Sequence, residues 1–393
     1  MSLFFNNFMA KITNTTITKT KTSLLCGLMV VLVLWSACNG SKEQDNGGLL
    51  PLKDYTELQA EQVFPDLIMK TPVKMLIIGD KLLIAQFRQD SLIQVVDLGM
   101  KEEPYMIAPK GAGPHDFYDI QNLLYLSEDS LLAIYDMNYR KYSYYNIKDS
   151  HIYLNDMNFV GSDYLRTKEG NCHPVPFGDY YILSMADEGK VLALNDKELK
   201  VVEYFGDYPG SYPGEMDFDP KKITNFTFSD SELFKLCHYQ QIITNPQQDR
   251  VVVAGMWSDW LAFFKKGGKT MEQTTAYYSY DTFTKVSDDP FNTGSKGGAL
   301  GPKHSKKTIA SYQDLYATEN YLYALYYGFP ELDEDNPAHT CYILQFSWDG
   351  DFLQAYRLKE VISHFAVDEE RGCIYTTYTA KGEDPVLLKY DLK

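Results

Sequence analysis

Apolar residues occur in short stretches along most of this chain, and turn-forming residues bound each stretch. Residues 82–87, 250–254 and 372–378 are typical, because they are rich in β-branched or aromatic side chains. Such runs predict β-strands, and the 31 Tyr and 21 Phe side chains suit half-buried pleated surfaces. Only residues 58–63 and 230–236 are expected to form short helices. The pattern therefore predicts an all-β fold.

The predicted strands recur as a repeated unit. Asp349-Gly350 marks one hairpin, because a type I′ turn needs positive φ at both central residues. Equivalent polar positions at Asp97, Asn146 and Asn195 are 49 residues apart, and the insertions 206–235 and 279–307 lengthen the later intervals. Six four-stranded units of about 50 residues predict a six-bladed β-propeller. A pair of β-sandwiches is the alternative, but it does not explain the spacing.

The two ends of the repeated region predict how the ring closes. The last unit ends at Lys393, just after its third strand, whereas residues 62–68 precede the first complete unit. We expect this N-terminal segment to supply the outer strand of the sixth blade, because closure removes an exposed sheet edge.

The N-terminal region has the three parts of a secretory signal. Lys11, Lys19 and Lys21 are followed by the apolar run 24–35 and then by Ser36-Ala37. The run has 12 residues, whereas a membrane-spanning helix needs about 20. The sequence thus predicts a lipoprotein-type signal peptide at 1–37, a flexible tether at 38–54 and a propeller at 55–393.

Cys38 follows the small residues directly, and residues 34–38 resemble the lipobox of bacterial lipoproteins, with Trp35 where Leu is usual. The resemblance implies that Cys38 is acylated and anchors the protein to the outer membrane of the cell envelope. An ordinary cleaved signal with an incidental Cys is the alternative.

Charge and cysteine content limit the classes of function. Without residues 1–37, the chain has 34 basic and 53 acidic residues, or a net charge of −19. This charge opposes binding to nucleic acid and to anionic lipid headgroups. Cys172, Cys237, Cys341 and Cys373 form no C-x-x-C pair, so they indicate no zinc ribbon or redox site. Disulfide bonds and buried free thiols both remain open.

Residues 110–117 (Lys-Gly-Ala-Gly-Pro-His-Asp-Phe) carry a resemblance to a known family. They are similar to the Gly-x-Gly-Pro-x-acidic-Phe turn between the first two blades of TolB-like six-bladed propeller lipoproteins of Gram-negative bacteria. His115 stands where a small residue is common. The resemblance implies an envelope protein with a binding or scaffolding role, and it supplies no catalytic residue and no cofactor.

Three histidines are candidate metal ligands. His173, His238 and His364 each lie where the first strand of a blade would begin, and first strands line a propeller's channel. Imidazole groups that meet there could bind a transition metal. Isolated polar or core histidines are the alternative. The acidic loop 333–336 could bind Ca²⁺ or could be a solvated loop.

Aromatic residues in or beside the insertions are candidate ligand-binding groups, since flat rings stack on sugars and peptide side chains. They are Tyr208, Tyr212, Trp257, Trp260, Tyr326 and Tyr327. The alternative is that they pack the insertions onto the blades.

No nucleophile elbow, H-E-x-x-H motif or Walker A motif is present. The sequence therefore predicts a non-catalytic binding or scaffolding propeller for a glycan, peptide or protein partner. A metal-assisted hydrolase or lyase with channel histidines is the competing function, and a structural subunit of an envelope complex is a third.

Overall fold

The structure is a computed structural model that describes residues 52, 54–147, 152–165, 174–184, 189–210, 238–268, 270–280, 285–287, 301–333 and 336–392. The chain divides after Asp45 into two units, and every described residue belongs to the second, Asn46–Lys393. Cys38 and the predicted signal peptide lie outside the described residues. No helix in the described part is long and apolar enough to cross a membrane.

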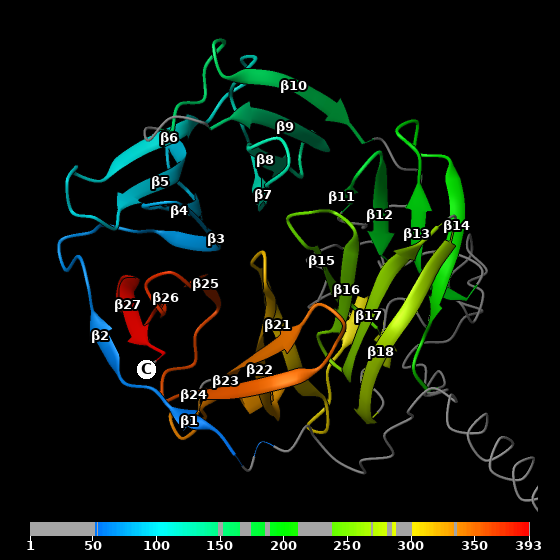
Figure 1. The fold of residues 1–393 in the computed structure, drawn as a ribbon. Helices are drawn as coiled ribbons and strands as arrows, with labels where there is room; N and C mark the ends of the chain where they lie inside the picture. Colours follow the sequence, from blue (N-terminus) through cyan, green and yellow to red (C-terminus); the bar gives the residue numbers. More distant parts are fainter. Residues whose placement is uncertain are drawn as a thin grey trace, which may run out of the picture. The chain divides into compact units, whose positions relative to one another are not determined.

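The described residues form six blades around a central channel (Figure 1). Blade one contains β3 (Thr71–Ile78), β4 (Lys81–Phe87), β5 (Ser91–Asp97) and β6 (Tyr105–Pro109). Blade two contains β7 (Ile120–Leu126), β8 (Leu131–Asp136), β9 (Lys141–Asn146) and β10 (Phe159–Tyr164). Blade three contains β11 (Val175–Phe177), β12 (Tyr180–Ser184), β13 (Lys190–Asn195) and β14 (Val201–Asp207).

The other three blades contain strands from the second half of the chain and two N-terminal strands. Blade four contains β15 (Gln240–Thr244), β16 (Arg250–Gly255), β17 (Asp259–Gly267) and β18 (Thr270–Tyr280). Blade five contains β21 (Ile309–Ala317), β22 (Tyr321–Pro330), β23 (Cys341–Ser347), β24 (Phe352–Leu358) and β1 (Thr56–Glu57). Blade six contains β25 (His364–Asp368), β26 (Cys373–Tyr378), β27 (Val386–Asp391) and β2 (Ala60–Gln62). A two-stranded hairpin, β19 (Lys285–Ser287) with β20 (Gly301–Lys303), and the 3₁₀ helix η2 (Glu331–Asp333) complete the described elements.

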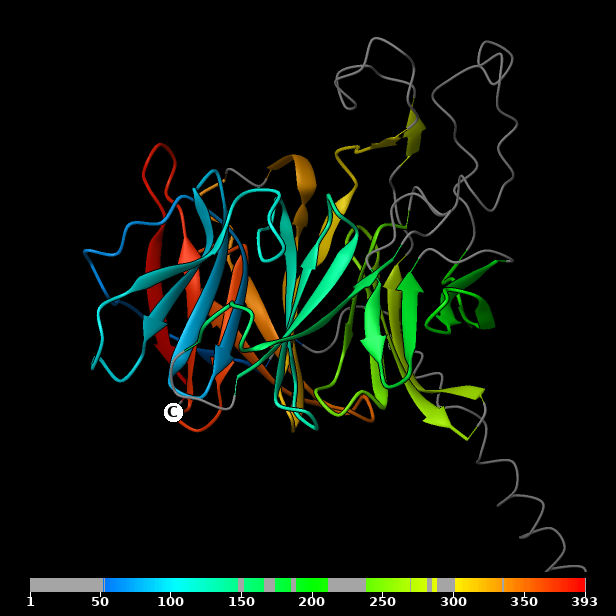
Figure 2. The same ribbon diagram turned by 90° about the horizontal axis from the view of Figure 1, so that it is seen from above.

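Each blade packs between two neighbours, and this explains the apolar runs in the sequence. Viewed edge-on, the strands of each blade run between the two faces of the ring (Figure 2). Residues 81–86 of β4 are all buried, as are residues 251–255 of β16. A strand with both faces covered cannot alternate apolar and polar residues, so it reads as a continuous apolar run.

The ring closes as predicted, with a short strand from the N-terminal side on the last blade. β2 pairs antiparallel with β27, and the Val63 backbone N–H donates to the Leu387 carbonyl oxygen at 3.0 Å. The pairing segment is Ala60–Gln62, which lies a few residues before most of the predicted segment 62–68. The helix expected at 58–63 is therefore wrong, because the edge of β27 gives these backbone groups hydrogen-bond partners. β1 pairs parallel with β24 and adds a fifth strand to blade five.

The predicted repeat and hairpin are present, with one difference in turn type. Asp97, Asn146 and Asn195 are each the last residue of the third strand of a blade. β23 and β24 form the predicted hairpin, but only Gly350 has a positive φ, of 95°, and its N–H donates to the Ser347 carbonyl at 3.0 Å. The loop is thus a type I turn followed by a left-handed glycine.

We expect Val63→Pro to destabilise the ring, because proline removes the N–H that bonds to Leu387 across the closure. The free energy of unfolding should fall by about 1–3 kcal/mol, measured by chemical denaturation. Val63→Ala is the matched control, since it shortens the side chain and keeps the N–H. Equal losses for the two variants would contradict a stabilising role for this hydrogen bond.

Candidate functional site

The six innermost strands surround two adjacent cavities along the channel. The outer cavity, of about 280 Å³, lies where β3, β7, β15, β21 and β25 end. The inner chamber, of about 150 Å³, is lined by residues of β3, β7, β11, β15 and β21, among them Gln121 and Gln240. Lys74, Ile243 and Leu315 line both, so the two spaces share a wall.

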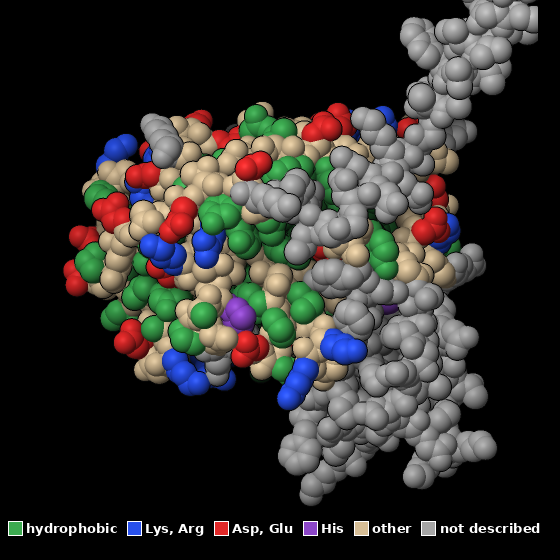
Figure 3. Space-filling view, turned by 90° about the horizontal axis from the view of Figure 1, so that it is seen from below, with side chains coloured by type: hydrophobic (Ala, Val, Ile, Leu, Met, Phe, Trp, Pro, Cys, Tyr) green, Lys and Arg blue, Asp and Glu red, His purple; other side chains and the backbone are tan. Residues whose placement is uncertain are grey.

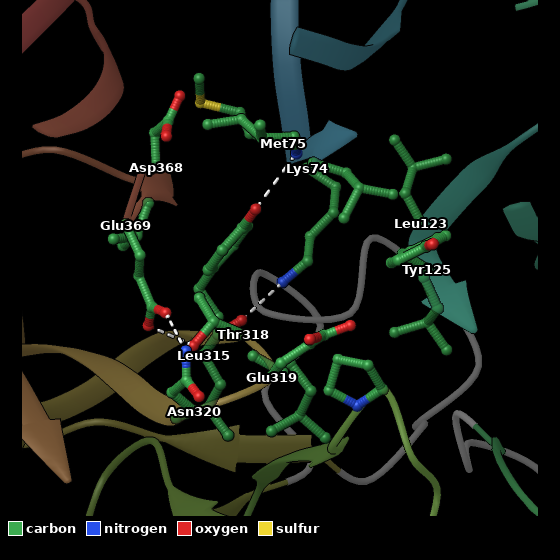
Figure 4. Close-up of a pocket in the computed structure, with 18 of the residues that line it drawn as sticks. Lys74, Met75, Leu123, Tyr125, Leu315, Thr318, Glu319, Asn320, Asp368 and Glu369 are labelled. Atoms are coloured by element: carbon green, nitrogen blue, oxygen red, sulfur yellow. Dashed lines mark hydrogen bonds between the residues drawn. The ribbon is translucent and has the colours of Figure 1, made fainter. Parts of the chain in front are cut away.

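Lys74 connects two blades across this shared wall. Its ammonium group donates to the Asp314 carboxylate at 2.7 Å and to the Leu315 carbonyl oxygen at 2.9 Å. The Lys74 side chain is 12% exposed and the Asp314 side chain 5% exposed. The other Asp314 carboxylate oxygen lies 3.5 Å from Nδ1 of His364, on β25. Residues from blades one, five and six thus form one charged cluster, and Figure 4 shows Lys74 reaching from β3 toward Leu315.

The environment of Asp314 favours its charged form. Burial raises the pKa of this carboxyl group, whereas Lys74 and His364 lower it. The lowering is larger than the effect of burial, so the pKa of Asp314 lies below the ordinary value. A folded-state pKa below the unfolded one means that ionised Asp314 contributes stability above the ordinary carboxyl pKa of about 4. That contribution is lost as the pH falls through the lowered pKa.

Carboxylate groups from blades five and six lie on one side of the mouth of the outer cavity. Glu319 and Glu370 are exposed there, and Glu369 lies beside them. Glu369 is held in place because it accepts hydrogen bonds from the Thr318 hydroxyl at 2.5 Å and from the Asn320 amide at 2.8 Å (Figure 4).

Apolar side chains form the inner walls of the outer cavity. Met75, Leu123, Ile243 and Leu315 are among the side chains that line it. On the side of the molecule shown in Figure 3, acidic and basic side chains are instead scattered among apolar and polar ones. The outer cavity therefore combines apolar contact area with a concentrated negative charge.

The predicted histidines have separate neighbours in the structure. His364 faces Asp314 in the channel, as described above. His238 is 1% exposed, and its ring packs edge-on against Tyr208 with centroids 5.7 Å apart. His173 lies outside the described residues. Among the residues that the structure describes, no group of three His, Cys, Asp or Glu side chains has metal-binding geometry.

The predicted aromatic residues differ in exposure. Trp260, Tyr326 and Tyr327 are 3%, 2% and 6% exposed and pack within the blades. Trp257 is half-buried and packs edge-on against His304, with centroids 4.4 Å apart. Tyr208 is half-buried beside His238, and Tyr212 lies outside the described residues. None of the described five lines the outer cavity or the inner chamber.

The two described cysteines are buried free thiols. Cys341 and Cys373 form no disulfide bond, and burial raises the pKa of Cys341 to about 12. In the acidic loop, Asp333 accepts from the Asn336 amide at 3.0 Å and lies 3.0 Å from the His339 ring nitrogen.

The glycine-rich turn links the first two blades, between β6 and β7. The Asp116 carboxylate accepts from the Gly113 N–H at 2.7 Å, and a Cβ on Gly111 would lie 2.3 Å from that carboxylate. The Phe117 side chain is fully buried, and its N–H donates to the Pro109 carbonyl at 2.9 Å. The spacing of glycine, acid and phenylalanine in the sequence thus follows from one tight turn.

Sequence reasoning did not identify Lys74 and Asp314. The available signal was a single charged residue within each of two otherwise uncharged strands, β3 and β21. Aligning the first strands of the blades would have placed both residues toward the channel.

We expect Lys74→Met to lower the free energy of unfolding at neutral pH by about 3–5 kcal/mol, because it leaves the Asp314 carboxylate buried without its cation. The loss should shrink as the pH falls, since protonation of Asp314 removes the uncompensated charge. Denaturant unfolding at several pH values measures both effects. Lys74→Met with Asp314→Leu is the control and should recover most of the stability. A loss that does not change with pH, or no recovery, would contradict the ion-pair explanation.

Several solved structures are similar to this chain at low sequence identity. A member of the duf4221 family from Bacteroides vulgatus ATCC 8482 is 11% identical, with a TM-score of 0.50, over 86% of this chain and 97% of that one. A candidate exported protein from Bacteroides fragilis NCTC 9343 is 13% identical, with a TM-score of 0.45, over 86% of this chain and 95% of that one. The Cps50 (Swd1) β-propeller domain of Myceliophteria thermophila is 12% identical, with a TM-score of 0.39, over 84% of this chain and 99% of that one.

The family comparison is more specific than these structural similarities. No curated protein matches the chain in sequence. The family model described as TolB-like 6-blade propeller-like matches residues 52–370, which include the glycine-rich turn and five complete blades. This match and the six observed blades show that the chain belongs to the TolB-like six-blade propeller family.

Proposed function

We propose that this protein is a lipid-anchored envelope propeller that binds, without catalysis, a peptide segment of a partner protein at the outer cavity. The observation that carries the proposal is the cluster of carboxylates on one side of the mouth of a largely apolar cavity at one end of the channel. Its volume of about 280 Å³ is near the lower limit of about 300 Å³ for ligand pockets and suits one or two side chains.

The charges at the mouth favour a basic segment. Lys74 is neutralised by Asp314, and Asp368 by Arg371 at 2.6 Å. In the described part of the chain, no cationic side chain lies within salt-bridge distance of Glu319, Glu369 or Glu370. A Lys or Arg side chain could place its charge among these carboxylates and its methylene groups against the apolar walls.

The lining favours a peptide over a glycan. Sugars are usually bound by exposed aromatic faces, whereas Tyr316 in the outer cavity is 4% exposed and its hydroxyl accepts from the Ile77 N–H at 3.1 Å. Tyr125 is the other aromatic side chain in the lining, and it is half-buried.

The anchor in this proposal is acylated Cys38, supported by the basic, apolar and small-residue pattern before it. We expect Cys38→Ser to move the protein from the membrane fraction to the soluble fraction and to abolish labelling by radioactive palmitate. Cys26→Ser is the matched control, because Cys26 lies inside the apolar run and should leave both unchanged. Membrane retention and labelling of Cys38→Ser would contradict lipid anchoring at this residue.

We expect the protein to select peptides that contain both basic and apolar residues from a synthetic peptide array. The double variant Glu319→Gln and Glu370→Gln should weaken their binding by roughly twofold to thirtyfold, because each exposed ion pair contributes about 0.2–1 kcal/mol. Added salt should reduce the wild-type affinity toward that of the variant.

Glu383→Gln is the control for this experiment, since Glu383 is exposed and lies outside the outer cavity. Fluorescence anisotropy with the selected peptides gives the affinities. Unchanged affinity in the double variant, or binding of glycans and no peptides, would contradict the proposed peptide site.

A further inference from the structure

The inner chamber contains a buried amide group without a protein partner. Gln240, the first residue of β15, is 6% exposed and lines the chamber. Neither its amide nitrogen nor its amide oxygen has a hydrogen-bond partner among the residues that the structure describes. Leaving such a group unsatisfied costs about 1–3 kcal/mol, so its position suggests that a polar molecule in the chamber bonds to it.

Other groups at the chamber wall can bond to the same molecule. Lys74 has three ammonium hydrogens and donates two of them, to Asp314 and Leu315. The Asp314 oxygen that faces His364 accepts no hydrogen bond within normal distance. Together with Gln240, the wall thus offers both donors and acceptors.

The described residues that line the chamber carry no net charge. Lys74 and Asp314 neutralise each other, and the nearby polar side chains Gln121, Asn122 and Gln241 are uncharged. A charged ligand would lose its hydration without gaining a counter-charge, which is unfavourable in a buried site. The chemistry of the wall therefore selects an uncharged polar ligand.

We propose that the inner chamber binds a small uncharged polyol or sugar of about five carbons or fewer, with Gln240 as its central contact. A hydroxyl group both donates and accepts, so it can bond to either end of the Gln240 amide. The volume of about 150 Å³ is that of about five water molecules at roughly 30 Å³ each. A carbon atom with its hydroxyl group occupies a similar volume to one water molecule.

This site is separate from the proposed peptide site. Gln240 lines the inner chamber and not the outer cavity, whereas the rim residues Glu319 and Glu370 line only the outer cavity. Substitution of Gln240 should therefore leave peptide affinity unchanged, and failure of one proposal does not imply failure of the other.

The experiment uses the full chain, extracted in detergent, and ligand-observed NMR with glycerol, erythritol, D-ribose, D-xylose and, as a charged comparator, glycerate. We expect at least one neutral probe to bind, glycerate not to bind, and Gln240→Met to weaken binding by about tenfold or more. Gln240→Met should also keep or raise the melting temperature without ligand, because it removes the unsatisfied amide. If Gln240 had a purely structural role, the Gln240→Met substitution would instead lower the melting temperature.

Gln354→Met is the matched control, because Gln354 lies on the outer strand β24 and its amide donates to Thr56 at 3.0 Å. It should bind the probe like the wild type. Gln240→Leu gives a second variant with the same expected loss if Gln240→Met does not fold. The proposal is overturned if no neutral probe binds at tens of millimolar, if glycerate binds equally well, or if the folded Gln240 variant binds like the wild type.

Discussion

Burial of both faces of each blade is the constraint on which the rest of this structure depends. Strands such as β4 and β16 are covered on both sides, so a blade without neighbours would expose continuous apolar surface. Six blades can bury these faces only in a closed ring, and the pairing of β2 with β27 closes it. The short N-terminal strand therefore contributes more to the architecture than its three residues suggest.

Ring closure also determines the chemistry of the channel. The innermost strands come from distant parts of the sequence, and closure brings β3 beside β25 and β21 near both. Lys74 and Asp314 are 240 residues apart, yet their charged groups are 2.7 Å apart. Because Asp314 is nearly buried, the charge of Lys74 helps to keep its carboxylate ionised. The same pair separates the acidic outer cavity from the uncharged inner chamber.

The two cavities suggest a division of roles along one axis. The outer cavity has carboxylates that lack cationic partners among the described residues, and such a surface attracts and orients a basic partner. The inner chamber has an unsatisfied amide and no net charge, which suits a small neutral molecule. The described residues that line both sites lie mainly on the innermost strands and the turns that follow them, and such strands hold contact groups in place before binding.

Much of the fold could be predicted from the sequence, because strand length, turn residues and the 49-residue spacing are local properties of the chain. The six blades, the glycine-rich turn at Gly111 and Gly113, and closure from the N-terminal side followed from them. The turn type at Asp349-Gly350 could not be predicted from these properties, because it depends on the φ of Asp349. The closing strand lies at Ala60–Gln62 and not at 62–68, because its position depends on its register with β27, which lies more than 300 residues away in the sequence.

The candidate site was largely beyond sequence reasoning. The sequence allowed two interpretations of aromatic residues such as Trp260 and Tyr326, as ligand contacts or as packing residues, and only the structure shows that they are buried. The sequence by itself determined the strand content, the repeat and the excess of negative charge. Only the tertiary structure decided which polar residues face the channel and which charges are compensated, because these depend on contacts between strands that the chain brings together only when the ring closes.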